Sequence, residues 1–185
     1  MAFHHSPRIV QDGLILTYDA ANVKSYPGSG TTWNDISGDN TGTLNNGPTF
    51  STDGLASFDF DGTNDDVSFT TPSAFNGATL NSFNCTLSSW AKFETIAQFE
   101  AIICLGTYDL EIAPVTATAV GIWVDNASLG GVTYTPTLDV WNNYSMTKSG
   151  NTYSLYVDGQ LIGAASDNDN ATIGSTSYLA RNGAT

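Results

Sequence analysis

The sequence predicts an all-β domain, built as an antiparallel sandwich of two sheets. Short apolar runs alternate with turn residues at close spacing, and 18 glycines among many Thr, Ser and Asn residues supply those turns. No stretch keeps the three-to-four-residue apolar period of a long helix. The chain has 185 residues, which is enough for one sandwich that buries about 70% of its unfolded surface.

The strongest local signal lies in residues 141–163, which predict three consecutive strands. Ser149-Gly150-Asn151 supplies the first turn and Asp158-Gly159 the second. Asp-Gly between apolar strands favours a two-residue hairpin, because that turn requires positive φ at both central residues. The expected cross-strand pairs are Val157 with Gln160, Tyr156 with Leu161, and Leu155 with Ile162.

Patterns of apolar and polar residues predict the other strands. Residues 58–61 alternate phenylalanine with aspartate, and residues 83–93 have one polar face that we expect to be solvated. Residues 101–105 are apolar throughout, so we expect burial on both faces. Residues 14–20 are also apolar on both faces and predict a central or covered first strand. Further strands are expected near residues 33, 42–44, 67–69, 110–112, 119–124, 172–173 and 178–180.

We expect an N-terminal arm at residues 1–11 and a single domain at residues 12–185. The arm is polar and contains a proline, whereas the apolar runs begin after it. We find no internal repeat, no linker and no sign of a second domain. The two cysteines, Cys85 and Cys104, are expected to be small buried residues on strands, although a disulfide between them is also compatible with the sequence.

Three segments carry a resemblance to a known family. They are the strands of residues 141–163 with Tyr156-Val157-Asp158-Gly159, residues 13–38 with Gly13-Leu14-Ile15-Leu16-Thr17-Tyr18-Asp19-Ala20, and Phe58-Asp59-Phe60-Asp61-Gly62-Thr63-Asn64-Asp65. In this order they resemble laminin G-like domains, which have a concanavalin A-like jelly-roll fold. The resemblance covers most of residues 12–181 and implies an antiparallel two-sheet jelly roll.

The order of these segments is similar to that in virion proteins of tailed phages, particularly marine ones. The resemblance therefore implies a non-enzymatic virion surface protein, such as a capsid decoration or fibre component. Its partners would be the major capsid protein or another virion protein, and further copies of itself. We expect attachment through exposed sheet edges and through the arm, with Phe3, Pro7, Arg8 and Ile9 at the contact. The alternative is a carbohydrate-binding adhesin module that recognises host-surface glycans.

Domains of this family continue past the region of Ala180-Arg181-Asn182-Gly183 with one more strand beside the first. Here the sequence stops at Thr185. The sequence is compatible with trimming, with loss of that strand, or with a strand donated by a neighbour. We expect the strand at residues 14–20 to pair with the N-terminal arm or another subunit, because an unpaired edge promotes association.

Charge and hydropathy narrow the classes of partner. Five Lys and Arg residues oppose 18 Asp and Glu residues, giving a net charge of −13 without any basic cluster. This balance argues against binding nucleic acid. No apolar run approaches the roughly 18 residues of a membrane span, and residues 1–10 lack the pattern of a signal peptide. These features agree with a protein on the virion surface.

The sequence contains no pattern typical of a hydrolase active site. Glycoside hydrolases with the implied fold need two carboxylates about 5–10 Å apart. The only glutamates are Glu94, Glu100 and Glu111, and none belongs to an alternating Glu-x-Asp-x-Glu cluster. His4 and His5 lie in the expected arm, so neither can activate a buried nucleophile. We therefore expect a protein without catalytic activity.

An oxygen-rich loop predicts a structural calcium site, because calcium takes six to eight oxygen ligands. Its candidate ligands are Asp59, Asp61, Asn64, Asp65 and Asp66. A second loop of this kind lies at residues 167–170. The alternative is that these aspartate and asparagine residues only form turns, as they commonly do.

Aromatic side chains predict candidate sugar platforms. We expect Trp123, Tyr134 and Tyr108 to contribute to carbohydrate binding if they are exposed. Aromatic residues of a sandwich more often belong to its core. We assign Trp141 to the core on that basis.

Overall fold

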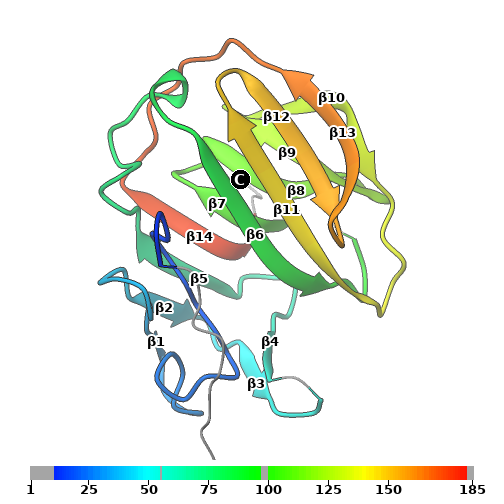
Figure 1. Ribbon diagram of the computed structural model, residues 1–185. Coiled ribbons are helices and arrows are strands. Elements are labelled where there is room, and N and C mark those ends of the chain that lie inside the picture. Colours follow the sequence, from blue (N-terminus) through cyan, green and yellow to red (C-terminus); the bar gives the residue numbers. More distant parts are fainter. Residues whose placement is uncertain (1–10, 55, 97–99, 183–185) are drawn as a thin grey trace, which may run out of the picture.

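The computed structural model describes residues 11–54, 56–96 and 100–182, which form a two-layer antiparallel β-sandwich (Figure 1). All strand pairs are antiparallel, as the sequence predicts. The larger sheet contains, in order, β1 (Thr32–Trp33), β2 (Gly42–Asn45), β5 (Asp66–Thr70), β14 (Thr176–Asn182), β7 (Glu100–Leu105), β8 (Leu110–Thr116), β9 (Ala119–Val124) and β10 (Ala127–Tyr134). The smaller sheet contains, in order, β13 (Gln160–Ser166), β12 (Thr152–Val157), β11 (Trp141–Ser149) and β6 (Cys85–Lys92).

Two short strands and one helical turn complete the described part of the chain. The strands β3 (Thr49–Ser51) and β4 (Ser57–Asp59) pair beside the larger sheet, and η1 (Leu80–Ser82) is a 3₁₀ turn before β6. No helix in the described ranges is long and apolar enough to span a membrane. The predicted arm contacts at Phe3, Pro7, Arg8 and Ile9 lie outside the described residues.

The predicted double hairpin is confirmed over residues 141–163. Asp158 and Gly159 have φ values of 49° and 76°, so both adopt the positive φ that the two-residue turn requires. Val157 pairs with Gln160 and Tyr156 with Leu161 as expected. The third predicted pair is wrong, because a β-bulge shifts the register and sets Leu155 opposite Gly163 instead of Ile162.

The main core lies between the two sheets. The inner face of the smaller sheet contributes Leu87, Tyr144, Met146, Tyr153, Leu155 and Val157, all of which are buried. They pack against the β7, β8 and β9 strands, whose inner residues include Ile103, Leu110, Ile112 and Ile122. The expected burial of residues 101–105 on both faces is confirmed. Both cysteines are free, with Cys104 buried and Cys85 half-buried.

A second hydrophobic core contains residues of β2 and β5 and of the turn-rich segment that precedes them. Trp33 is buried there with Tyr26, Leu44 and Val67. Phe58 packs on this group, with its ring centroid 4.6 Å from that of Trp33. Trp33 therefore anchors the turn-rich segment to this second core.

The predicted first strand at residues 14–20 is wrong, because this segment forms no strand. Its backbone is satisfied by single contacts with a neighbouring loop: the Thr17 amide donates to Asp35 Oδ1 at 2.9 Å, and the Ile36 amide donates to the Thr17 carbonyl at 3.0 Å. Ile15 packs on the main core and Tyr18 on the second, which explains the apolar residues on both sides. The predicted pairing of this strand with an arm or another subunit loses its basis.

The strand β14 occupies the centre of the larger sheet, between β5 and β7 (Figure 1). It is longer than the weak strand expected at residues 178–180. Thr172 makes only an isolated bridge with Thr79, so no strand forms at residues 172–173. The strand β10 was not predicted, because its sequence lacks a clear alternating pattern.

Lys148 joins the turn between β11 and β12 to the segment that leads into β6, from inside the sandwich. Only 2% of this residue is exposed. Its Nζ donates to the Phe83 carbonyl at 3.0 Å and to the Gly150 carbonyl at 2.8 Å. The ammonium also lies 5.1 Å from the Phe83 ring centroid and 5.4 Å from that of Tyr153. Lys148 thus gives the Phe83 and Gly150 carbonyls a charged hydrogen-bond donor.

We expect Lys148→Met to lower the free energy of unfolding by about 2 kcal/mol, since it removes hydrogen bonds from a charged donor. For a domain of this size, this loss corresponds to a fall in Tm of roughly 4–8 °C, measured by calorimetry. Lys92→Met is the matched control, because Lys92 makes only a 4.0 Å contact with Glu94 near the surface. Equal Tm values for the two variants would contradict the assigned role of Lys148.

Candidate functional site

The outer face of the smaller sheet presents two exposed tryptophans. Side chains alternate between the two faces of a strand. Leu87 points inward, so Trp90, three residues later on β6, lies on the outer face. Asn142 and Tyr144 point inward, so Trp141 lies on the outer face of β11. Trp90 is 63% exposed and Trp141 is 41% exposed. The register pairs Trp141 with Lys92 and Asn143 with Trp90, so the tryptophans are diagonal neighbours on one face. The core assignment of Trp141 is therefore wrong.

A small polar network adjoins these tryptophans. Asn143 Nδ2 donates to Ser88 Oγ at 3.1 Å, and Ser145 Oγ donates to Asn143 Oδ1 at 2.7 Å. The Ser88 and Ser145 hydroxyls lie 2.8 Å apart. The network fixes the orientation of the Asn143 amide beside the tryptophan rings. We call Trp90, Trp141, Ser88, Asn143 and Ser145 the tryptophan face.

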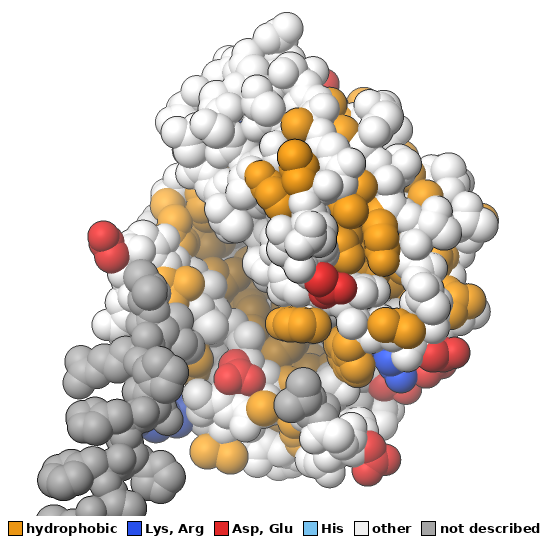
Figure 2. All heavy atoms as spheres, turned by 45° about the vertical axis from the view of Figure 1, so that its right-hand side comes forward, with side chains coloured by type: hydrophobic (Ala, Val, Ile, Leu, Met, Phe, Trp, Pro, Cys, Tyr) orange, Lys and Arg blue, Asp and Glu red, His pale blue; other side chains and the backbone are white. Residues whose placement is uncertain are grey.

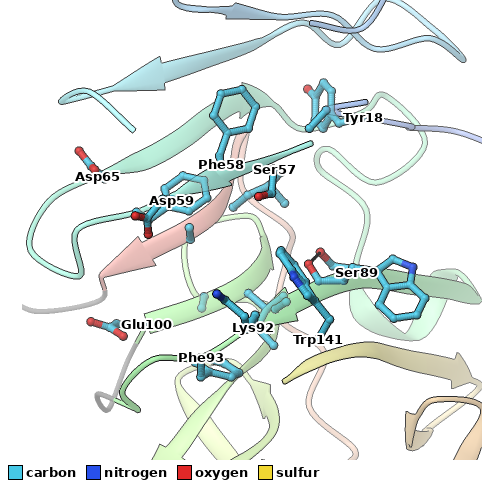
Figure 3. A pocket seen from close by; sticks show the side chains of 18 of the residues that line it. Tyr18, Ser57, Phe58, Asp59, Asp65, Ser89, Lys92, Phe93, Glu100 and Trp141 are labelled. Carbon is cyan, nitrogen blue, oxygen red and sulfur yellow. Dashed lines mark hydrogen bonds between the residues drawn. The ribbon is translucent and has the colours of Figure 1, made fainter. Parts of the chain in front are cut away.

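A groove of about 860 Å³ opens beside this face. One wall comes from β6 and Trp141, and the other comes from β4 and the segment around Tyr18 (Figure 3). Apolar side chains such as Phe58, Phe93 and Ile102 line it. Figure 2 shows this hollow, with hydrophobic side chains in its depth and acidic side chains near its margin. The strand β6 is the edge of its sheet, so its free backbone edge borders the groove.

Carboxylates outnumber cations among the groove residues. Among the described residues that line the groove, one is a lysine, Lys92. The acidic lining residues are Asp19, Asp59, Asp61, Asp65, Glu94 and Glu100. Asp59 on β4 and Lys92 on β6 lie on opposite walls (Figure 3). The groove is therefore an apolar cleft with an acidic margin.

Several carboxylate oxygens of the predicted calcium loop accept hydrogen bonds from backbone amides. Asp61 Oδ1 accepts hydrogen bonds from the amides of Thr63, Asn64 and Asp65, and these bonds lower the pKa of the Asp61 carboxyl. Asp65 Oδ2 in turn accepts from the Asp61 amide at 3.1 Å. Asp66 Oδ1 accepts from Asn45, while the Asn64 carbonyl accepts from Asn46. These contacts are those of a turn-forming loop.

Within the residues that the structure describes, no group of three or more acidic, histidine or cysteine side chains is arranged to hold a metal ion. Asp59 is exposed at the groove and does not join such a group. In the second loop, Asp167 and Asp169 accept hydrogen bonds from nearby backbone amides. Calcium binding at either loop stays a prediction.

The predicted sugar residues do not meet in one place. Tyr134 packs on the main core, with its ring centroid 6.3 Å from that of Tyr144. Trp123 lies half-buried on the outer face of the larger sheet, where its Nε1 donates to the Pro114 carbonyl at 3.3 Å. Tyr108 lies in the turn before β8, with the Arg181 guanidinium 4.8 Å from its ring centroid. These three aromatics therefore form no common platform.

Trp90 is not among the predicted site residues, although a signal for it is present in the sequence. The same alternation that placed Leu87 on the inner face puts Trp90 on the outer face with Ser88. Trp141 follows from the alternation along β11, since it lies two residues before outward Asn143 and so shares its face. Counting positions from a secure inner residue would have found both.

Glu111 is a buried carboxyl on the outer face of the larger sheet. Only 6% of the residue is exposed, and burial raises its pKa to about 7. Arg181 opposes this rise and Asp109 adds to it. On β8, Glu111 stands opposite Cys104, whose pKa burial also raises. This carboxyl lies outside the groove.

We expect the stability of the protein to fall as pH rises from about 4.5 through about 7, by up to about 3 kcal/mol from Glu111, since one pKa unit corresponds to about 1.4 kcal/mol. The raised pKa of Glu111 means that the folded state favours the neutral acid more than the unfolded state does. The stabilising contribution of neutral Glu111 is therefore complete below about pH 4.5, where both states are protonated. Glu111→Gln should flatten this dependence in urea unfolding measured from pH 4 to pH 8.

Asp53→Asn is the control for this measurement, because it removes one negative charge from an exposed turn. If Glu111→Gln keeps the same slope as the unaltered protein, the assignment of a raised pKa to Glu111 is incorrect.

Comparisons with known proteins support the fold. A family model described as the concanavalin A-like lectin/glucanases superfamily matches residues 61–184. No curated protein matches the sequence. Domain 4 of an extracellular arabinanase from Geobacillus stearothermophilus, solved with arabinotriose, is 11% identical with a TM-score of 0.57. The alignment covers 80% of this chain and 78% of that domain.

Two larger proteins contain a similar domain. The receptor-binding domain of botulinum neurotoxin type G is 12% identical with a TM-score of 0.59, over 85% of this chain and 42% of that one. A sialidase mutant from Trypanosoma rangeli is 12% identical with a TM-score of 0.61, over 91% of this chain and 31% of that one. This chain thus spans less than half of either protein, and at these identities the likeness shows the fold alone. The family match covers most of the sequence, so the chain belongs to the concanavalin A-like lectin/glucanase superfamily, within its laminin G-like group.

Proposed function

We propose that this protein is a non-catalytic carbohydrate-binding module, and that the tryptophan face holds the glycan. The observation that carries the proposal is the pair of exposed, adjacent tryptophans, Trp90 and Trp141, beside a fixed asparagine amide. Exposed large aromatic side chains cost free energy in water, so their presence on one flat face needs a reason. Binding of an apolar sugar surface supplies one.

The face offers both kinds of contact that a sugar ring needs. The tryptophan rings can stack on the C–H faces of a pyranose or furanose, with the indole N–H groups as donors. Asn143, Ser88 and Ser145 supply donors and acceptors in fixed positions for the hydroxyls. A few oriented polar groups on a largely apolar surface are typical of small-molecule sites.

The comparisons support a sugar ligand without identifying it. The family is that of lectins and glucanases, and a domain of the same fold was solved with arabinotriose. The fold likeness to a sialidase does not bring its reaction to this chain, because the identity is 12%. The absence of catalysis is part of the proposal.

The virion role predicted from the sequence resemblance can coexist with this function. A module that binds host-surface glycans would attach a particle to its host, which joins the two predicted roles. The capsid partner, the virion surface location and the oligomeric state rest on that resemblance alone and stay predictions.

We expect Trp90→Ala and Trp141→Ala each to weaken glycan binding about tenfold or more, as loss of a central aromatic contact does in other interfaces. The ligand would first be found by screening the full chain on a glycan array, and affinities would then be measured by calorimetry. Because both side chains are exposed, the variants should keep the Tm of the unaltered protein within a few degrees.

Leu161→Ala is the matched control, since Leu161 is 59% exposed on the same sheet but lies outside the tryptophan face. It should bind as the unaltered protein does. Trp123→Ala tests whether the outer face of the larger sheet holds the glycan instead. No binding on the array, or binding that Trp123→Ala removes and Trp90→Ala leaves intact, would refute the proposed site.

A further inference from the structure

We propose that the groove gives the glycan site a charge preference: among oligosaccharides, it favours chains that carry amino groups over neutral chains, and it rejects chains of uronic acids. This inference rests on the proposed function. It adds the chemical class of the ligand and assigns a role to the groove. The groove is continuous with the tryptophan face, and its walls carry an excess of carboxylates among the described residues.

The groove and the tryptophan face are parts of one surface. Trp90, Trp141, Ser88 and Asn143 belong to the face and also line the groove. An oligosaccharide stacked on the two tryptophans therefore meets the groove with its next sugar units. The volume of about 860 Å³ lies within the range of small-molecule pockets, roughly 300–1,000 Å³, so the groove can hold part of such a chain.

Six carboxylates and one lysine are among the described residues that line this groove. The lysine, Lys92, lies 4.0 Å from Glu94 Oε1, which offsets its charge. Asp61 accepts three backbone hydrogen bonds that lower the pKa of its carboxyl, so it keeps its negative charge well into the acid range. The groove is thus negative as a consequence of its local structure.

The expected order of affinities follows from this charge. A sugar ammonium is attracted by the carboxylates and by the faces of tryptophan rings. A neutral chain keeps the stacking contacts and gains no charge interaction. A uronic acid chain is repelled by the same carboxylates, which is an effective way to reject a competing ligand. Because the carboxylates line an open groove, salt should weaken the preference.

The test measures binding of the full chain to three oligosaccharides by calorimetry at about pH 5.5, where amino sugars are protonated and ordinary carboxyls are ionised. The probes are hexamers of glucosamine, N-acetylglucosamine and galacturonic acid. We expect glucosamine hexamer to bind about tenfold more tightly than N-acetylglucosamine hexamer, and galacturonic acid hexamer to show no binding. A salt concentration of about 0.5 M should reduce the difference between the first two.

The double variant Asp59→Asn and Glu94→Gln should bring the ratio of the glucosamine hexamer affinity to the N-acetylglucosamine hexamer affinity closer to one. Asp39→Asn with Asp53→Asn is the control, since both carboxylates are exposed and lie outside the groove. This control should keep the preference of the unaltered protein. A loss of preference in the control pair would assign the effect to overall charge and overturn the role of the groove.

The outcomes separate this inference from the proposed function. If glucosamine and N-acetylglucosamine hexamers bind equally, or galacturonic acid hexamer binds best, the charge preference is refuted while Trp90-dependent binding still supports the glycan site. If none of the three binds but a Trp90-dependent ligand appears on the array, the inference alone fails. If the array is also empty, both fail.

Discussion

The alternation of side chains along β11 is the constraint on which the tryptophan face depends. Asn142, Tyr144, Met146 and Lys148 point inward and are buried, so each residue between them must point outward. A shift of one residue would move Tyr144 and Met146 into solvent and bury Trp141 and Asn143. The free energy gained by the core therefore determines which residues are displayed for binding, although none of the displayed residues contributes much to that core.

Asp158 connects the turn chemistry to this face. Its Oδ1 accepts from the Asn143 amide at 2.8 Å, and its Oδ2 accepts from Asn142 Nδ2 at 2.7 Å. These bonds lower the pKa of the Asp158 carboxyl, so the ionised form that holds them is favoured. Asp158, which makes the hairpin turn, therefore also fixes the backbone of Asn143. The side-chain amide of Asn143 belongs to the polar network. The stability of the turn and the geometry of the site are therefore linked.

Local chemistry explains why the sequence predicted some features and missed others. The Asp158-Gly159 turn and the alternating strands depend on near neighbours, and the structure confirms them. Trp141 was assigned to the core because tryptophan is usually well buried, but the alternation along β11 that buries Tyr144 turns Trp141 outward. Its position beside Trp90 depends on the register with β6, which joins segments far apart in sequence. Residues 14–20 have the composition of a strand, yet they pack on two hydrophobic clusters and form hydrogen bonds with a loop. No local sequence pattern predicts this tertiary arrangement.

The proposed binding function requires no proton donor in the groove, and the ionised Asp61 carboxyl agrees with that proposal. Glycoside hydrolysis requires an acid with a raised pKa next to an ionised carboxylate across the scissile bond. In the described residues, the carboxyl with the strongly raised pKa is Glu111, which faces outward from the other sheet and does not line the groove. In the groove, Asp61 has a lowered pKa because backbone amides hold its ionised form. A carboxylate held in this way donates no proton to a leaving group, but it presents a constant negative charge to a bound chain.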